Sequence, residues 1–169
     1  IDYNYIRNEG QSGRMGVRLM VIVAEGDRGR IYLAPTPEHE AVAQQAQPTW
    51  QPDNVLPVNP RDFKTPNYGM TTFADLFTPR QLVALTTFSD LVQEARKRVK
   101  QDALASGLPD DDIPLAEGGT GAQAYADAVV VYWACAIDRM AMTGNSLVRW
   151  NCVGEKAQHC FGRQALPML

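Results

Sequence analysis

The chain has few of the side chains that catalytic and metal sites use. Its 169 residues include two histidines and three cysteines, Cys135, Cys152 and Cys160, with no CxxC spacing. Together with His159, the last two cysteines match no standard zinc pattern. An odd number of thiols is typical of a reducing compartment, where cysteines pack as small hydrophobic side chains. Because no nucleophile and base can be paired either, we expect no catalytic residues and no metal ligands in this chain.

Long apolar runs are missing as well. The longest, Ala128 to Ile137, has ten residues, whereas a membrane-spanning helix needs about 18. No signal peptide is visible either. We therefore expect a cytoplasmic chain that makes no membrane contact. Because the chain begins with Ile1 and not with Met, we also expect it to be a piece excised from a longer protein.

Charge of one sign is not in excess overall, but it is unevenly distributed. The net charge is -3, and 45% of the residues are hydrophobic, as in a soluble globular domain. Residues 101–127 hold six acids and no Lys or Arg. A basic group directly before them comprises Arg96, Lys97, Arg98 and Lys100. We interpret both groups as solvated faces, and a polyanion-binding site is the alternative.

The first third of the chain predicts a β-hairpin and a short helix. Residues 15–24 are β-branched and apolar, residues 25–29 have turn chemistry, and alternation resumes at 30–33. Before them, three glycines and three arginines form a flexible approach, whose arginines either meet phosphates or pair with nearby acids. A short exposed helix is predicted over 38–47. Four prolines in 48–60 indicate an extended connector.

The second half predicts two long helices. Thr78-Pro79-Arg80-Gln81 is a capping box that starts a helix extending to about Ser106. Thr120 and Gln123 form a second capping box, which opens a helix to about Thr143. That second helix is apolar nearly all round, so we expect it to be buried in the middle of its domain. A short terminal helix is predicted over 155–161.

These elements define an α+β fold. An N-terminal β-hairpin lobe is followed by a mainly helical lobe with two long packed helices. We expect the hairpin and short helix to occupy residues 1–47, the extended proline-rich connector and loop to occupy 48–77, and the helical lobe to occupy 78–169. One compact domain is the alternative.

The loop before the first long helix is the main candidate site. Two cations flank Phe63 there, and an Asn-Tyr pair follows. Interleaved cations and rings suit a single-stranded or flipped nucleotide, because rings stack on bases and cations meet phosphates. We predict nucleic-acid contacts from Arg61, Lys64, Asn67, Tyr68 and Arg14. The alternative is a structural loop whose rings dock on the core, while Asp62 neutralises the nearby cations.

The segment Gly118-Gly119-Thr120-Gly121 is similar to a phosphate-cradling loop at a helix start. Such loops follow a strand directly, so that the turn aims backbone amides at the ligand. Here the preceding residues contain two prolines and a run of acids, which would repel phosphate. We therefore expect no cofactor-binding residues in this chain.

Several motifs resemble one protein family. They are Tyr5-Ile6-Arg7, Glu9-Gly10, Gly13-Arg14-Met15-Gly16, Asn59 to Gly69, Phe77 to Leu82, Gly118 to Gly121 and Phe161 to Ala165. On these motifs the chain resembles the central segment of the large bacterial adenine-specific DNA methyltransferases that contain a zinc ribbon and an N-terminal domain of unknown function, the DUF1156 family. The likeness extends over nearly the whole chain, and the block of residues 59–82 is its most specific part.

The resemblance implies a parent enzyme that transfers a methyl group from S-adenosylmethionine to N6 of adenine in DNA, which requires extrusion of the base. This chain lacks the D-P-P-Y-type loop, the glycine-rich S-adenosylmethionine motif and the cysteine-paired ribbon. Asn59-Pro60-Arg61-Asp62 shares two letters with the N-P-P-Y variant and lacks its second proline and aromatic ring.

We therefore expect a noncatalytic segment, inactive alone, that helps to recognise DNA or braces the catalytic domain. Its expected partners are DNA and the remaining domains of the parent methyltransferase. S-adenosylmethionine and, with the ribbon, zinc would be held elsewhere in the parent. The alternative is a structural insertion that contacts other proteins of a restriction-modification or phage-defence system and makes no DNA contact.

Overall fold

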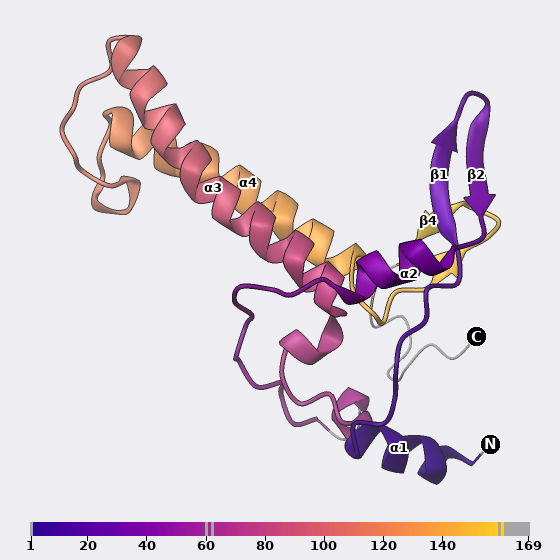
Figure 1. Ribbon diagram of the computed structural model, residues 1–169. Helices are drawn as coiled ribbons and strands as arrows, with labels where there is room; N and C mark the ends of the chain where they lie inside the picture. The colour runs from indigo at the N-terminus through magenta and orange to yellow at the C-terminus, as the bar shows by residue number, and fades with distance from the viewer. Residues whose placement is uncertain (1, 60, 62, 159, 161–169) are drawn as a thin grey trace. The chain divides into compact units, whose positions relative to one another are not determined.

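The computed structural model describes residues 2–59, 61, 63–158 and 160 (Figure 1). Its contacts divide the chain into two compact units. Unit 1 comprises the described residues up to Val83 and those from Met142 onward, and unit 2 comprises Ala84–Ala141. Unit 1 is therefore discontinuous in sequence, and the two long helices each begin or end inside it.

The fold is α+β, with a small two-stranded hairpin followed by two long packed helices, as predicted. The α-helices and strands are α1 (Tyr3–Gln11), β1 (Ile22–Gly26), β2 (Gly29–Leu33), α2 (Pro37–Gln44), α3 (Pro79–Ala105), α4 (Ala122–Thr143), β3 (Trp150–Asn151) and β4 (Lys156–Ala157). Short 3-10 helices are η1 (Thr65–Tyr68), η2 (Ala74–Leu76) and η3 (Leu115–Glu117). The predicted domain boundaries at 47 and 77 stay predictions.

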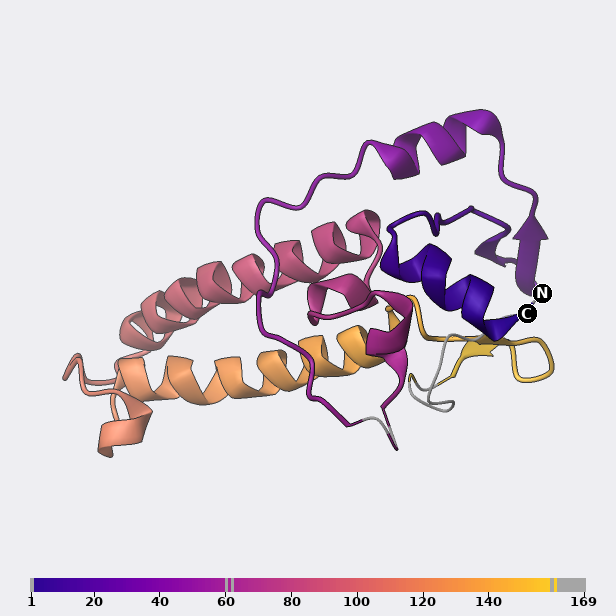
Figure 2. The ribbon, with the colours of Figure 1, turned by 90° about the horizontal axis from the view of Figure 1, so that it is seen from below.

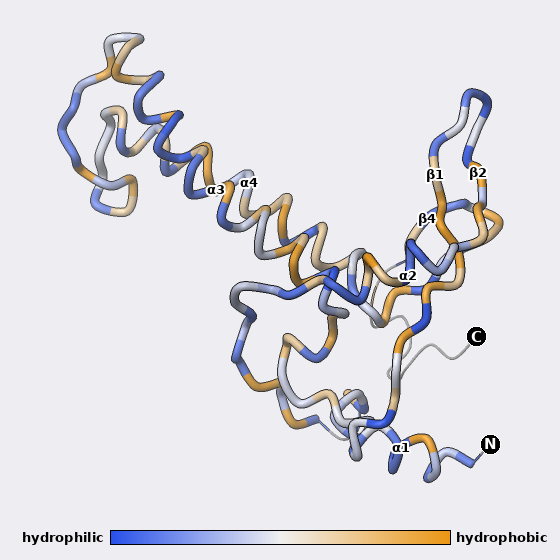
Figure 3. The backbone as a smooth tube through the Cα atoms, in the orientation of Figure 1, coloured by the Kyte–Doolittle hydropathy of each residue, from blue (hydrophilic) through white to orange (hydrophobic). Residues whose placement is uncertain are grey.

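The hairpin is shorter than its apolar run. β1 and β2 pair antiparallel, with Ile22 opposite Leu33 and Gly26 opposite Gly29. The strand was predicted to start at residue 15, but pairing begins at Ile22 because β2 has no residues beyond Leu33 to pair with earlier ones. The hairpin is hydrophilic at its turn and hydrophobic at its base (Figure 3).

The first part of the N-terminal segment is a helix, where its glycines suggested a flexible approach, and residues 14–21 have no helix or strand. α1 includes Gly10 in its last turn. A glycine weakens a helix by about 1 kcal/mol relative to alanine, which is why the sequence did not predict one. The stabilising contacts of α1 lie with η1, described below.

Half of the predicted capping box forms at the start of α3. The Thr78 N–H donates to Gln81 Oε1 at 2.8 Å, as the motif requires. The reciprocal bond is missing, because the Thr78 hydroxyl is buried without a hydrogen-bond partner. The predicted second capping box does not form: α4 begins at Ala122, and the Gln123 amide donates to Asp127 instead.

The prediction that α4 is buried throughout is wrong. Its first turns are buried, with Ala122, Ala124 and Ala126 nearly inaccessible. From Val131 to Ala136, however, every residue is exposed. Within unit 2, α4 lies alongside α3, and both views show this antiparallel pair (Figures 1 and 2). Because α3 covers one face of α4, other apolar side chains of α4 remain exposed.

Charges that are segregated in sequence are paired in space. Arg96 Nε donates to Asp127 Oδ1 at 2.8 Å, and Arg98 bonds Asp102 at 3.1 Å one turn later. Lys100 pairs with both Asp110 and Asp112. The basic end of α3 therefore meets the acidic segment that follows it, and the two groups neutralise one another within unit 2.

Asp127 is the centre of this network. Burial opposes its ionisation, but hydrogen bonds from Arg96, the Leu115 N–H and Gln123 outweigh that cost and hold the pKa of Asp127 below its ordinary value. The carboxylate thus links α3, α4 and η3. This bonding explains why an acid interrupts the otherwise apolar first half of α4.

The predicted terminal helix over 155–161 is wrong for the residues that the structure describes there. β3 and β4 form an antiparallel hairpin with Trp150 opposite Ala157, and Glu155 has a positive φ of 46°. Trp150 meets the edge of the Tyr32 ring at 6.3 Å, and the Tyr32 hydroxyl donates to Glu155 at 3.2 Å. The second hairpin thus packs on the first inside unit 1. Residues 159 and 161–169 lie outside the described part of the chain.

Candidate functional site

The loop before α3 is built around a small apolar core in unit 1. Leu56, Leu76 and Leu147 are buried together, and the rings of Phe63 and Phe77 pack against them. These contacts match the structural alternative for the loop, in which its rings dock inward. Phe73, by contrast, is 41% exposed.

Backbone pairing fixes the two ends of the loop. The Leu56 N–H donates to Thr71 O at 2.9 Å, and the Phe73 N–H donates to Asn54 O at 3.0 Å. On the other side, both the N–H and the hydroxyl of Ser146 donate to Leu76 O, at 2.8 and 2.7 Å. The proline-rich connector, the loop and the chain after α4 are therefore joined in one unit.

The backbones of α1 and η1 approach closely at two glycines. A Cβ at Gly10 would lie 2.3 Å from Tyr68 O, and a Cβ at Gly69 would lie 2.4 Å from Gly10 O. Gly69 also has a φ of 87°, which ends η1 in the left-handed conformation. The Gln11 side chain donates to Asn67 O at 3.1 Å beside this crossing. α1 can lie on η1 only because neither position carries a side chain.

Tyr68 is buried at this crossing, with 6% of its surface exposed. The Arg7 guanidinium lies over its ring at 5.8 Å from the centroid, a distance that suits a cation–π contact. The ring is therefore occupied by the chain's own helix. A nucleic-acid base could stack on it only after α1 had moved away.

The four remaining candidate residues lie in different environments. Arg61 and Asn67 are exposed and Lys64 is half-buried on the same loop. Arg14 is bound to Glu9 through two hydrogen bonds of 2.8 and 2.7 Å. That pair lowers the pKa of Glu9 and raises the pKa of Arg14, chiefly through the side-chain hydrogen bonds. Arg14 thus has an acid partner inside the chain. Asp62, the expected neutralising acid, lies outside the described residues.

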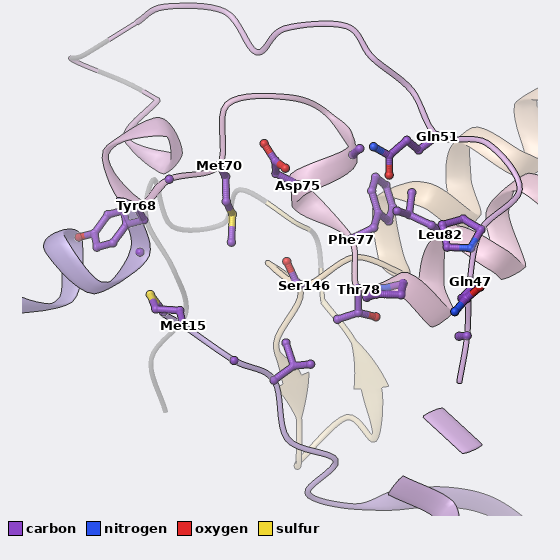
Figure 4. Close-up of a pocket in the computed structure, with 18 residues that line it drawn as sticks. Met15, Gln47, Gln51, Tyr68, Met70, Asp75, Phe77, Thr78, Leu82 and Ser146 are labelled. Carbon is purple, nitrogen blue, oxygen red and sulfur yellow. The ribbon is translucent and has the colours of Figure 1, made fainter. Parts of the chain in front are cut away.

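A cavity of about 940 Å³ lies in unit 1 between the N-terminal segment, the connector and the loop. Figure 4 shows Met15 and Met70 on one side of it, Phe77 and Leu82 on the other, and Ser146 between them. Its walls are mostly apolar. Of the polar side chains in its lining, Asp75 and Ser146 are hydrogen-bonded within the fold, whereas the Thr78 hydroxyl is buried without a partner. Sequence reasoning did not identify this cavity, because its walls come from four segments that are far apart in the chain.

Asp75, at the edge of this cavity, is a structural acid. Its carboxylate accepts from the N–H groups of Thr71 and Thr72 at 2.7 and 2.8 Å. Burial opposes ionisation, but these hydrogen bonds outweigh it and lower the pKa of Asp75. A carboxylate held in this way is a poor general base, because the hydrogen bonds reduce its proton affinity.

The glycine-rich segment 118–121 uses its first two amides for the fold. The Gly118 and Gly119 N–H groups donate to Leu115 O and Pro114 O, and the Ala122 N–H, directly after the segment, donates to Pro109 O. A Cβ at Gly119 would lie 2.0 Å from Ile113 O. The glycines permit this close folding of residues 109–121 on themselves.

The histidine and cysteine residues form no cluster in the described part of the chain. His39 is exposed, and its Nδ1 accepts from the Thr36 N–H at 3.1 Å, which caps α2. Cys135 and Cys152 are exposed and Cys160 is partly buried, so the expectation that all three thiols are packed is wrong for the first two. No group of three His, Cys, Asp or Glu side chains that could hold a metal occurs among the described residues. His159 lies outside them.

Comparisons with known proteins identify no family for this chain. No family model matches it, and no curated protein or solved structure is similar to it at a significant level. Among the described residues, no helix combines the length and apolarity that crossing a bilayer would require. The site is therefore assessed from its own geometry.

Proposed function

We propose that the chain is a noncatalytic scaffold segment of an S-adenosylmethionine-dependent DNA adenine N6-methyltransferase. The family half of this proposal rests on the motifs around residues 59–82. The scaffold half is supported by one observation: the most distinctive loop of the chain turns its rings inward, onto Leu56, Leu76 and Leu147 and under α1.

The cations of the chain also favour a scaffold. Arg7 lies on Tyr68, Arg14 is paired with Glu9, and the basic end of α3 is paired with the acids that follow it. DNA-binding surfaces keep their cations available for phosphates, since displacement of counterions supplies most of the affinity. Here several of the candidate cations already have partners within the chain.

A second candidate function is direct DNA contact by the loop. It is favoured by the exposure of Arg61 and Asn67 beside the half-buried Lys64. A third, a protein-interaction insertion without DNA contact, is favoured by the exposed apolar half of α4. The scaffold proposal and the third candidate agree that the loop makes no essential phosphate contact.

DNA-binding measurements separate these candidates. We would titrate the 169-residue chain into fluorescent duplex and single-stranded DNA at about 50 and 200 mM salt, the range in which phosphate contacts weaken steeply. An Arg61→Ala/Lys64→Ala double variant is compared with an Arg28→Ala/Lys156→Ala double variant, which removes the same charge elsewhere in unit 1. The scaffold proposal expects equal, weak binding by both. A loss of tenfold or more in the loop variant alone would favour the DNA-contact candidate.

The cofactor expectation has its own test. In this proposal S-adenosylmethionine and zinc belong to other domains of the parent, so calorimetry with this chain should detect no micromolar binding of S-adenosylmethionine. The family half is tested by the complete reading frame, in which we expect paired cysteines upstream and a D-P-P-Y loop downstream. A reading frame with neither feature would contradict the methyltransferase assignment, but the scaffold geometry would be unaffected.

A further inference from the structure

The helical hairpin of unit 2 carries an apolar groove of about 490 Å³. Every residue that lines it is hydrophobic: Phe88, Leu91, Val92, Trp133, Ala136, Ile137 and Met140. Phe88 and Trp133 remain about half exposed, at 50% and 47%. A groove without a polar group offers nothing to orient a small polar ligand, so we consider a protein surface as its occupant.

A protruding ring stands beside this groove. Tyr132 is 78% exposed, and it lies one helical turn before Ala136, whose side chain forms part of the groove wall. One surface therefore presents an empty apolar groove and, next to it, an aromatic ring without cover.

The charge of this surface is compatible with a second copy of the chain. No charged residue occurs from Ala128 to Ile137, and none lines the groove. A two-fold interface brings the same patch together from both copies, so a charged patch would repel itself and an uncharged one does not. Such an interface also requires that each copy present both a ring and a groove, which this surface does.

The available area is sufficient for a reversible dimer. An aromatic side chain buries about 150–250 Å² when it is covered. Phe88, Trp133 and Tyr132, which are 50%, 47% and 78% exposed, therefore offer, together with Leu91, roughly 400 Å² per copy. Two copies would cover roughly 800 Å², which is in the range of weak, transient complexes.

We propose that unit 2 is a homodimer interface, in which Tyr132 of each copy enters the apolar groove of the other. The inference stands apart from the proposed methyltransferase scaffold, because it uses only the surface of α3 and α4. It expects a dimer that dissociates on dilution, since the covered area is smaller than that of a stable specific complex.

Sedimentation of the 169-residue chain over about 1 to 200 μM tests the proposal, because mass action makes the dimer fraction depend on concentration. We expect twice the chain mass at the upper end. Tyr132→Lys should raise the dimer dissociation constant by roughly thirtyfold, the effect of losing an interface anchor. Gln101→Lys, which adds the same charge at an exposed position far along α3, should leave it unchanged.

A charge-swap pair distinguishes the contact from damage to the fold. Leu91→Asp places an acid in the groove and should also yield monomers. Mixed with Tyr132→Lys, it should recover dimers, because one native ring-in-groove contact is kept and the other becomes a Lys–Asp pair. Circular dichroism of each variant reports whether α3 and α4 are intact.

Three results would overturn the inference. If the wild-type chain stays monomeric at every concentration, the groove does not mediate a homodimer and is a surface for another protein. A dimer that tolerates Tyr132→Lys is formed by another surface. Two folded monomeric variants that fail to associate when mixed would show that Tyr132 and the groove are not partners.

Discussion

Substituting Gly69 by alanine tests whether the glycine crossing holds unit 1 together. The new Cβ would meet a backbone oxygen at 2.4 Å, and the φ of 87° is a conformation that residues with a side chain avoid. The conformation costs about 1–2 kcal/mol, and forcing apart closely packed backbone costs about 1–3 kcal/mol more. A loss of roughly 2–5 kcal/mol is a large part of the 5–15 kcal/mol that stabilises a typical domain.

Two other glycines separate these contributions. Gly13 has a φ of 65°, but a Cβ there would meet nothing within 4 Å, so the loss of stability in Gly13→Ala comes from the conformation alone. Gly10 lies in a helix, where alanine is favoured by up to about 1 kcal/mol, and its Cβ would meet Tyr68 O at 2.3 Å. We expect urea unfolding to show the greatest loss for Gly69→Ala, and smaller losses of up to about 2 kcal/mol for Gly13→Ala and for Gly10→Ala.

Gly16→Ala is the matched control, because Gly16 has open space and no positive φ. Its stability should stay within about 0.5 kcal/mol of the parent. If Gly10→Ala were more stable than the parent by about 1 kcal/mol, the gain that helix propensity alone gives, α1 would not lie on η1 as described. Equal losses for Gly69→Ala and Gly13→Ala would show that conformation alone, and not the crossing, makes Gly69 necessary.

Three further predictions concern hydrogen bonds and ionisation. Asp127→Asn should lower the free energy of unfolding by about 1–3 kcal/mol, because it weakens a charged network. Asp102→Asn, in an exposed pair, should lower it by less than about 0.5 kcal/mol. Chemical denaturation measures both. The folded-state pKa of Asp75 is lowered, so its stabilisation is full above the unfolded-state value of about 4 and is lost as pH falls through the folded value. Asp75→Asn should therefore flatten the acid limb of a stability–pH profile, and an unchanged limb would contradict the assignment. Thr78→Val should be neutral or stabilising by up to about 1 kcal/mol, since the buried hydroxyl has no partner, and a clear drop in melting temperature would show that this hydroxyl is bonded.

Local signals were sufficient for several elements. The start of α3 at Pro79 follows from a capping motif with proline in the first turn, and the hairpin follows from alternation around a glycine-containing turn. Both signals depend on residues that are close together in the sequence. Such short-range chemistry can be read directly from the sequence.

The elements that were missed depend on distant contacts. α1 is stabilised where Gly10 crosses Gly69, and the β3–β4 hairpin carries Trp150 against Tyr32. The periodicity of α4 showed that its residues are apolar, but not how many neighbours would cover them. For the candidate site, composition identified the loop correctly as unusual but could not give the direction in which Tyr68 points.

The bonds from Ser146 to Leu76 have a consequence for how the chain tolerates change in length. They tie the point where the chain leaves unit 1 to the point where it returns, so residues 84–141 are an insertion with a closed base. Removing about seven residues, or two turns, from each of α3 and α4 would shorten the insertion by roughly 10 Å while keeping their facing sides in register. The length of the helical hairpin can therefore be changed without rebuilding the core of unit 1.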